Sequence, residues 1–409
     1  MKRYFSRNGW LFLFQGMFFC FGYAFFDASN VLPVYVEKLT GSLVLASLPY
    51  VLKLACSALG QLSFGMMFLK KKNIPHYLGF LMMASYSSPI LTIIAILLNF
   101  SDLFIAIAVL VSVFCMWIFE GSLYIGFYDT FGRTMDSIER GRVSGLMQGA
   151  GGVLALIGAL VVRQILNADL QINTQYLIIF AIAAAILVFS YINIFFLKVN
   201  LVPDRNFKIL DEYKKLPQTM KGEKNFLKIE ISQIFFFLAT ISVPVSLVIC
   251  ETYFHYSETL VNNLYLLQVL GIVLGGLIGV FITPKLGTMN TIRLFAFAGL
   301  GSAVFGFFAI LTGGNLVLAA IMILCGGITL SSWVGYVNGV LDLANEENMS
   351  RFILLNSIFS FPFAFVYLCP SYLISWIGIQ GFFILCSAFG VISILVMIGV
   401  KKQNSQLSS

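Results

Sequence analysis

Long apolar runs separated by short polar breaks follow one another along almost the whole chain of 409 residues. Each run can cross the roughly 30 Å hydrocarbon core of a bilayer, which takes about 20 helical residues. The pattern therefore predicts an all-α membrane protein with twelve transmembrane helices. The expected spans are 9–32, 43–69, 75–98, 102–128, 142–166, 174–198, 229–254, 258–282, 291–312, 316–341, 351–377 and 380–400.

The longest polar stretch of the chain, residues 199–228, lies between the sixth and seventh apolar runs. It contains Pro203, Pro217 and the charged run DEYKK, which favours a linker over a further span. The sequence therefore predicts three parts. They are an N-terminal six-helix bundle over 1–198, a cytoplasmic linker over 199–228 and a C-terminal six-helix bundle over 229–409.

The composition excludes an ordinary soluble domain. Hydrophobic residues make up 59% of the chain and charged residues only 11%, whereas about 25% is usual in soluble domains. The seven cysteines lie in apolar runs without a CxxC pair and there are two histidines, so we expect neither a disulfide framework nor a metal site. No phosphate-loop, HExxH or nucleophile-elbow motif occurs in the sequence. We therefore expect no enzyme, no ATP-driven pump and no cofactor.

Lysine and arginine residues are distributed unevenly between alternate breaks. Counting the breaks from the N-terminus places 22 of the 25 on the side of that terminus and only Lys38 and Arg163 on the other, while Lys53 falls within a span. Because basic residues are retained on the cytoplasmic side, we expect a multi-pass protein of the cell membrane with both termini in the cytoplasm. The net charge of +7 is then a topology signal and does not indicate nucleic-acid binding. The first run exceeds the length of a signal-peptide core, so we expect it to be a span.

The two halves share a local pattern. The segment Ile125-Gly126-Phe127 in the fourth span corresponds to Val334-Gly335-Tyr336 in the tenth. Sixteen residues after each glycine comes an arginine, Arg142 or Arg351, at the start of the following span. The pattern favours an internal duplication, and transporters built in this way bind substrate near the membrane midplane, where their repeats meet.

Two six-helix halves, a basic linker and cytoplasmic termini resemble the major facilitator superfamily over essentially the whole chain. The resemblance implies alternating access between the two halves. The loop after the second span keeps the family's glycine, Gly65, and its basic cluster, but has Leu69 where the family has an aspartate. Drug exporters of the family carry an Arg-x-x-Gln-Gly type motif in the fourth span, where this chain has Trp117 through Gly121 with Glu120 as the polar residue. The fifth span is glycine-rich but lacks the antiporter proline.

Four charged residues lie within or near the ends of the predicted spans, although a charge near the bilayer centre costs about 2.5–3.5 kcal/mol. Asp27 and Lys53 fall at similar depth on consecutive spans, and they form either a pair that handles a proton or a charged substrate group, or a structural ion pair. Glu120 has no basic partner at its depth and is either a proton carrier or a neutral carboxyl group bonded to a neighbouring helix. Glu251 is a further proton-coupling candidate, or lies at the outer water boundary.

A cluster of charges surrounds the break between the fourth and fifth spans. Asp129 and Arg142 lie at helix ends, and Arg351 is the counterpart of Arg142 in the second half. These three residues are candidates for a cytoplasmic gate. The alternative is an ordinary solvated loop, in which ion pairs contribute little.

Aromatic and amide side chains suggest a substrate cavity. A cavity lined by rings and a few amides suits an amphipathic organic molecule, although the same residues also serve as interfacial anchors and packing groups. The cavity candidates are Trp117, Tyr124, Gln148, Trp333, Asn338 and Asn356.

These features predict a monomeric secondary active transporter that moves a small amphipathic or lipophilic organic molecule across the cytoplasmic membrane. Proton-coupled export is the first hypothesis, with a lipid bilayer, protons and the substrate as partners and no nucleic acid. Two alternatives stay open, an importer of a sugar, peptide or organic acid on the same fold, and a receptor or lipid-handling scaffold that transports nothing.

Overall fold

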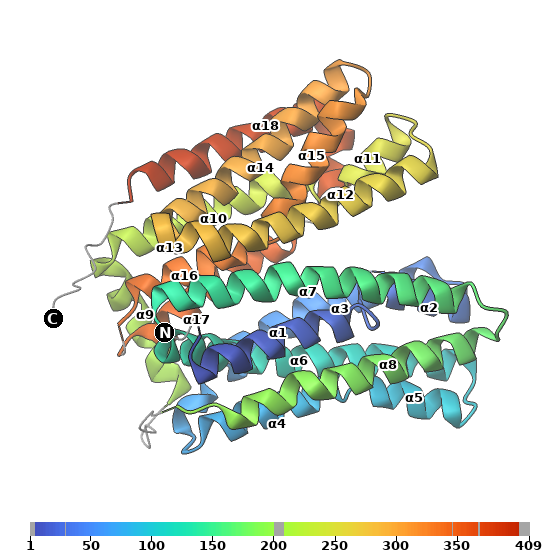
Figure 1. Ribbon diagram of the computed structural model, residues 1–409, viewed down its shortest axis with the longest axis horizontal. Coiled ribbons are helices and arrows are strands. Elements are labelled where there is room, and N and C mark those ends of the chain that lie inside the picture. Colours follow the sequence, from blue (N-terminus) through green and yellow to red (C-terminus); the bar gives the residue numbers. More distant parts are fainter. Residues whose placement is uncertain (1–4, 29, 200–207, 346, 367–368, 401–409) are drawn as a thin grey trace. The chain divides into compact units, whose positions relative to one another are not determined.

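The computed structural model describes residues 5–28, 30–199, 208–345, 347–366 and 369–400. Within these residues the regular secondary structure is helical throughout (Figure 1). Ten helices of the described part are long and apolar enough to cross a membrane. The first and eleventh expected spans correspond to the shorter helices α1 (Arg7–Tyr23), of 17 residues, and α17 (Met349–Ala364), of 16. The all-α class predicted from the hydropathy pattern is confirmed.

The chain forms two compact units. Unit 1 consists of Met1–Met135 and Ala150–Tyr213, and unit 2 of Asp136–Gly149 and Lys214–Ser409. The helix α7 (Ser137–Leu166) therefore contributes its first part to unit 2 and the remainder to unit 1. The division into bundles over 1–198 and 229–409 follows the order of the spans and stays a prediction.

Unit 1 is built around the contact between α3 (Leu43–Phe64) and α6 (Asp102–Thr134). A Cβ atom on Gly121 would lie 2.0 Å from the carbonyl oxygen of Ser57, and one on Gly60 would lie 2.3 Å from that of Ile118. The two glycines thus allow the backbones to touch, as small residues do between transmembrane helices. The other elements are α1, α2 (Val31–Thr40), η1 (Met67–Lys70), α4 (Ile74–Tyr86), α5 (Pro89–Leu97), α8 (Ile172–Ile192) and η2 (Asn193–Phe196).

Unit 2 contains a similar close helix crossing at two glycines. The helix α12 (Glu258–Leu277) packs against α15 (Leu316–Thr329), where a Cβ atom on Gly327 would lie 2.1 Å from the carbonyl oxygen of Gln268 and one on Gly271 2.4 Å from that of Leu324. The close pairs are the second and fourth spans of one half and the eighth and tenth of the other, in agreement with an internal duplication. The other elements are α10 (Lys224–Ala239), η3 (Thr240–Ser242), α11 (Ser246–Thr252), η4 (Ile278–Ile282), α13 (Thr283–Leu286), α14 (Thr288–Leu311), α16 (Trp333–Leu343), α17 and α18 (Pro370–Ile398).

The expected linker contains a helix, α9 (Ile209–Gly222). The hydroxyl group of Tyr213 donates a hydrogen bond to the carbonyl oxygen of Leu62 at 2.5 Å. This bond attaches the start of α9 to the end of α3.

Several spans are broken where the sequence predicted continuous helices. The expected first span, 9–32, is wrong in this respect, because α1 ends at Tyr23 and α2 begins at Val31. Asp27 and Asn30 lie in this break, where their side chains bond to each other and compete with helical hydrogen bonding. The third span breaks before Pro89, which has no backbone N–H to continue a helix. The seventh breaks around Pro244 and the tenth between Thr329 and Trp333.

Candidate functional site

Tyr23, at the end of α1, stands between Asp27 and Lys53. The ammonium group of Lys53 donates a hydrogen bond to the Tyr23 hydroxyl oxygen at 3.1 Å. The same oxygen accepts from the backbone N–H of Ala28 at 3.3 Å, and the hydroxyl group is hydrogen-bonded to the Asp27 carboxylate. The structure thus brings together the two charges that the sequence placed at similar depth, and it inserts a phenol group between them.

Aromatic rings flank the Lys53 ammonium group. Its nitrogen lies 5.1 Å from the ring centroid of Tyr23 and 5.0 Å from that of Trp117. The two rings contact each other edge to face, with centroids 5.6 Å apart. Cation–π attraction stabilises an ammonium ion in this position. Trp117, expected to line a cavity, therefore contacts a charged residue of α3.

Glu120 of α6 meets α4 and α1 through Tyr86. Its carboxyl group forms a hydrogen bond with the Tyr86 hydroxyl, which also accepts a hydrogen bond from the Gln15 amide at 3.3 Å. The Oε2 atom of Glu120 is buried and has no hydrogen-bond partner within the described part of the chain. A buried polar atom without a partner is costly, so its retention in a transmembrane helix points to a functional role.

Two tyrosines follow Glu120 along α6. The rings of Tyr124 and Tyr128 pack edge to face with centroids 4.7 Å apart. Tyr124 was a cavity candidate, and the structure pairs it with Tyr128 one turn further along the helix.

Glu230 of α10 is a buried carboxylate that the sequence analysis missed. It is 1% exposed, and the Asn356 amide on α17 donates to its Oε1 and Oε2 at 3.0 and 3.3 Å and to Gln233 Oε1 at 2.7 Å. The predicted seventh span begins at residue 229, which places Glu230 at its edge, where a charge is expected to reach water. Its buried neighbours Phe226 and Gln233 lie four residues before and three residues after it, a helical spacing that could have revealed it.

The remaining amide candidates belong to unit 2. Trp333 donates its indole N–H to Gln148 Oε1 at 2.6 Å. Asn338 donates to Ser144 Oγ at 2.9 Å and to the Val334 carbonyl oxygen at 2.7 Å, and its Oδ1 is buried with no partner among the described residues. The first part of α7 thus meets α16 through two polar contacts.

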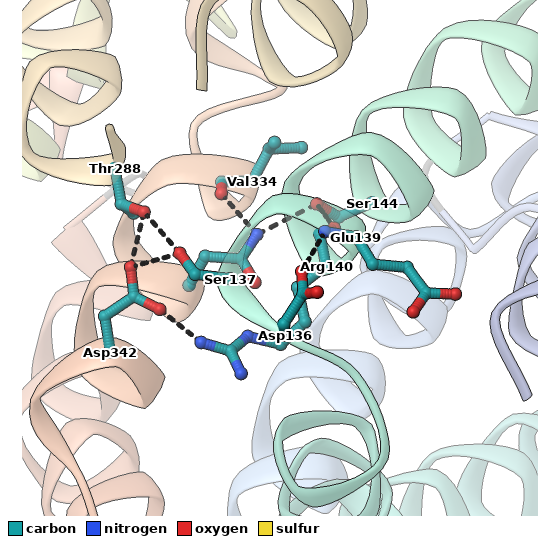
Figure 2. A network of polar contacts seen from close by, with 9 residues as sticks. Asp136, Ser137, Glu139, Arg140, Ser144, Thr288, Val334 and Asp342 are labelled. Atoms are coloured by element: carbon teal, nitrogen blue, oxygen red, sulfur yellow. Dashed lines mark hydrogen bonds and ion pairs between the residues drawn. The ribbon is translucent and has the colours of Figure 1, made fainter. Parts of the chain in front are cut away.

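A further polar network lies at the start of α7 (Figure 2). The Asp342 carboxylate of α16 forms an ion pair with Arg140 and accepts hydrogen bonds from Ser137 at 2.8 Å and Thr288 at 2.5 Å. Asp136 accepts from the backbone N–H of Glu139 at 2.8 Å, which satisfies an N–H group in the first turn of α7. The sequence analysis gives Asp342 no role, and the residue lies just beyond the predicted tenth span, 316–341.

The gate candidates and Glu251 have other surroundings. Asp129 is fully buried and forms an ion pair with Arg133 of its own helix, with nitrogen–oxygen distances of 2.7 and 3.2 Å. Arg142 and Arg351 are partly buried, in the second turn of α7 and the first turn of α17. Glu251 is exposed at the end of α11. No group of three or more histidine, cysteine, aspartate or glutamate residues placed to hold a metal ion occurs in the described ranges.

Comparison with known proteins begins with sequence. No family model matches the chain. A segment of 138 residues is 25% identical to the putative transporter AmpG 1 of Rickettsia felis (strain ATCC VR-1525 / URRWXCal2). It covers 32% of this chain and 31% of that protein, so the chain matches about a third of the length of this relative.

Solved structures match over nearly the whole chain. A bacterial homologue of the iron transporter ferroportin, in an outward-facing state, has a TM-score of 0.73 at 12% identity over 96% of this chain and 99% of its own. The E. coli fucose:proton symporter FucP, a Major Facilitator Superfamily transporter, has a TM-score of 0.70 at 13% identity over 97% and 100%. The chain has the major facilitator fold. The human organic anion transporter MFSD10 shares this fold, with a TM-score of 0.68 at 14% identity over 96% and 99%.

The major facilitator fold and the apolar helices together make this a multi-pass membrane protein. The three proteins named are transporters, in agreement with the expectation that the chain is not an enzyme. At 12–14% identity the likeness concerns the fold, and function has to be argued from the residues of this chain.

Proposed function

We propose that the protein is a secondary active transporter that exports a small amphipathic or lipophilic organic molecule by alternating access, driven by protons. The major facilitator fold and the partial match to a putative transporter support transport in general. Spans interrupted at polar residues support it further, because broken helices expose backbone groups where transporters bind ions and substrates.

Proton coupling rests on Glu120. Its carboxyl group lies within a transmembrane helix, bonded to Tyr86 and with a buried oxygen that has no partner among the described residues. Intramembrane carboxyl groups of this kind form proton relays in pumps and transporters. We assign Asp27 as a second proton-handling group, since Tyr23 connects it to Lys53.

The amphipathic character of the substrate is inferred from the rings and amides. In unit 1, Trp117 and Tyr124 belong to α6, the helix that also carries Glu120. In unit 2, Trp333, bonded to Gln148, combines an apolar face with polar atoms, and Asn338 retains an oxygen with no described partner. Apolar surfaces with a few fixed polar groups are typical of sites for small organic molecules.

We assign the network around Asp342 to a cytoplasmic gate, with Asp129, Arg142 and Arg351 as further gate residues. The ion pair joins Arg140 of α7 to Asp342 of α16, and α7 continues from unit 2 into unit 1. A movement of α7 relative to α16 would break this pair. Such a pair can therefore favour one of two conformations, as alternating access requires.

A second candidate function is proton-coupled import of a sugar. It is favoured by the similarity of the fold to FucP and to the proton:xylose symporter XylE, whose TM-score is 0.69 at 10% identity. The sign of the imposed pH gradient distinguishes import from export, because a proton symporter accumulates its substrate in vesicles with an acidic exterior, whereas a proton antiporter accumulates it in vesicles with an acidic interior.

The experiment that tests the proposal uses purified protein in liposomes. Compounds that raise the melting temperature of the solubilised protein are offered under an imposed pH gradient. The wild type is expected to accumulate or expel at least one of them, and Glu120→Gln to lower this gradient-driven flux at least about tenfold. Glu251→Gln serves as the control, because Glu251 is exposed and the proposal therefore leaves this earlier candidate out of the proton path. Gradient-driven flux that persists in Glu120→Gln contradicts proton coupling at this site.

A further inference from the structure

Lys53 is a cation in a transmembrane helix, and the described part of the chain provides no direct ion pair for it. It belongs to the segment Val44–Lys70, which is apolar enough to cross a membrane. The ion pairs between described residues join Arg133 to Asp129 and Arg140 to Asp342, and neither includes Lys53. A charge in this position is costly to the fold, so its retention calls for a function.

Asp27 and Lys53 do not form a direct ion pair, because the Tyr23 hydroxyl group lies between the carboxylate and the ammonium group. That hydroxyl accepts hydrogen bonds from Lys53 and Ala28 and is bonded to Asp27. A phenol group has one proton and two lone pairs, so all its hydrogen-bonding capacity is used. The Asp27 carboxylate also accepts a hydrogen bond from Asn30 at 2.6 Å.

The ammonium group keeps donors for a further acceptor. Of its three N–H groups, one donates to Tyr23, and no other acceptor is found for it in the described part of the chain. The rings of Tyr23 and Trp117 flank the nitrogen at 5.1 and 5.0 Å. Ring faces attract a cation but do not neutralise it. Lys53 as a whole is partly buried.

We propose that Lys53 binds an anionic group of the transported molecule, a carboxylate or a comparable oxyanion, and that Trp117 packs against the adjoining apolar or aromatic part. The proposal rests on the function proposed above and adds the charge of the substrate to it. The anion completes the hydrogen bonds of the ammonium group and gives it a direct counter-charge, whereas Asp27 reaches Lys53 only through the Tyr23 hydroxyl group.

The test compares how tightly the full-length, detergent-solubilised protein binds probes that have the same shape but differ in charge. The probes are phenylacetate, 3-phenylpropionate and indole-3-acetate, each with its neutral carboxamide. Thermal stabilisation is measured as a function of probe concentration, since a ligand of the folded state raises the melting temperature. At least one carboxylate is expected to bind the wild type about tenfold more tightly than its carboxamide, because a charged partner strengthens a hydrogen bond.

Variants assign this preference to one residue. Lys53→Gln is expected to bind carboxylate and carboxamide equally, whereas Lys53→Arg keeps the preference. Lys38→Gln, the same change at an exposed lysine, serves as the control and also keeps it. Equal binding of every carboxylate and its carboxamide by the wild type overturns the proposal even if a variant fails to fold, and so does a preference that survives in Lys53→Gln. Proton-driven transport without any preference for the carboxylates would overturn anion binding at Lys53 and leave the proposed function standing. A preference for the carboxylates without proton-driven transport would overturn the proposed proton coupling and leave anion binding at Lys53 standing.

Discussion

The Asn356 amide donates hydrogen bonds to both carboxylate oxygens of Glu230, at 3.0 and 3.3 Å. The two residues are 126 positions apart in the chain, on α10 and α17, and both are buried. The partners of Glu230 among the described residues are neutral. A buried carboxyl group held by an amide depends strongly on that amide, because losing the donor leaves its oxygen atoms without a partner in an apolar setting.

Asn356→Ala is expected to lower the free energy of unfolding by about 1–3 kcal/mol, because it leaves a buried acceptor without its donor. Glu230→Gln, which keeps the shape and an acceptor oxygen for Asn356, is expected to cost less. In the double variant the cost of Asn356→Ala should fall, and a double-mutant cycle on melting temperatures measures the difference. Strict additivity of the two substitutions would contradict the coupling.

The ion pair between Arg140 and Asp342 provides the second prediction. The two side chains are 7% and 19% exposed. Asp342→Asn keeps an acceptor for Ser137 and Thr288 but removes the ion pair, so it should destabilise the conformation described here by roughly 3 kcal/mol or less. Exchanging the charges, Arg140→Asp with Asp342→Arg, should restore part of the loss.

Cysteine pairs across this network, cross-linked in the membrane, report how often α7 contacts α16. We expect less cross-linking in Asp342→Asn than in the wild type and an intermediate level in the charge exchange. Equal cross-linking in all three proteins would contradict the proposal that the network around Asp342 acts as a gate.

The crossing of α7 and α12 provides a third prediction, with a control one turn away. A Cβ atom on Gly145 would lie 2.5 Å from the carbonyl oxygen of Gly276, whereas the nearest atom to one on Gly149 lies 3.5 Å away. Gly145→Ala is therefore expected to destabilise unit 2 by about 1–3 kcal/mol, because backbone cannot move aside as a side chain can. Gly149→Ala should be tolerated and can gain up to about 1 kcal/mol in helix propensity. Melting temperatures that change equally in the two variants would contradict the close crossing.

The sequence predicted the spans well because the period and length of apolar runs report directly on a bilayer. It did not predict the break before Pro89, where the missing backbone N–H of one proline interrupts a long apolar run, or the break at Asp27, which depends on local competition between side chains and the helix backbone. Such competition leaves mean hydropathy almost unchanged.

Some residues of the candidate site were predicted from the sequence and others were missed. The common depth of Asp27 and Lys53 was visible in the spacing, but the intervening phenol group of Tyr23 was not, since only the fold brings it there. Glu230 and Asp342 were missed because both lie near predicted span ends, where a charge normally reaches water. Their burial depends on neighbouring helices, which the sequence of one helix does not reveal.

The most direct test of proton coupling at Glu120 follows protons and substrate in the same liposomes. A pH-sensitive dye enclosed in the vesicles records the proton flux that accompanies addition of a transported compound, for the wild type, Glu120→Gln and Glu251→Gln. Our account predicts a substrate-dependent pH change in the wild type and in Glu251→Gln, and its loss in Glu120→Gln while exchange of substrate across the membrane continues. An undiminished pH change in Glu120→Gln would contradict it.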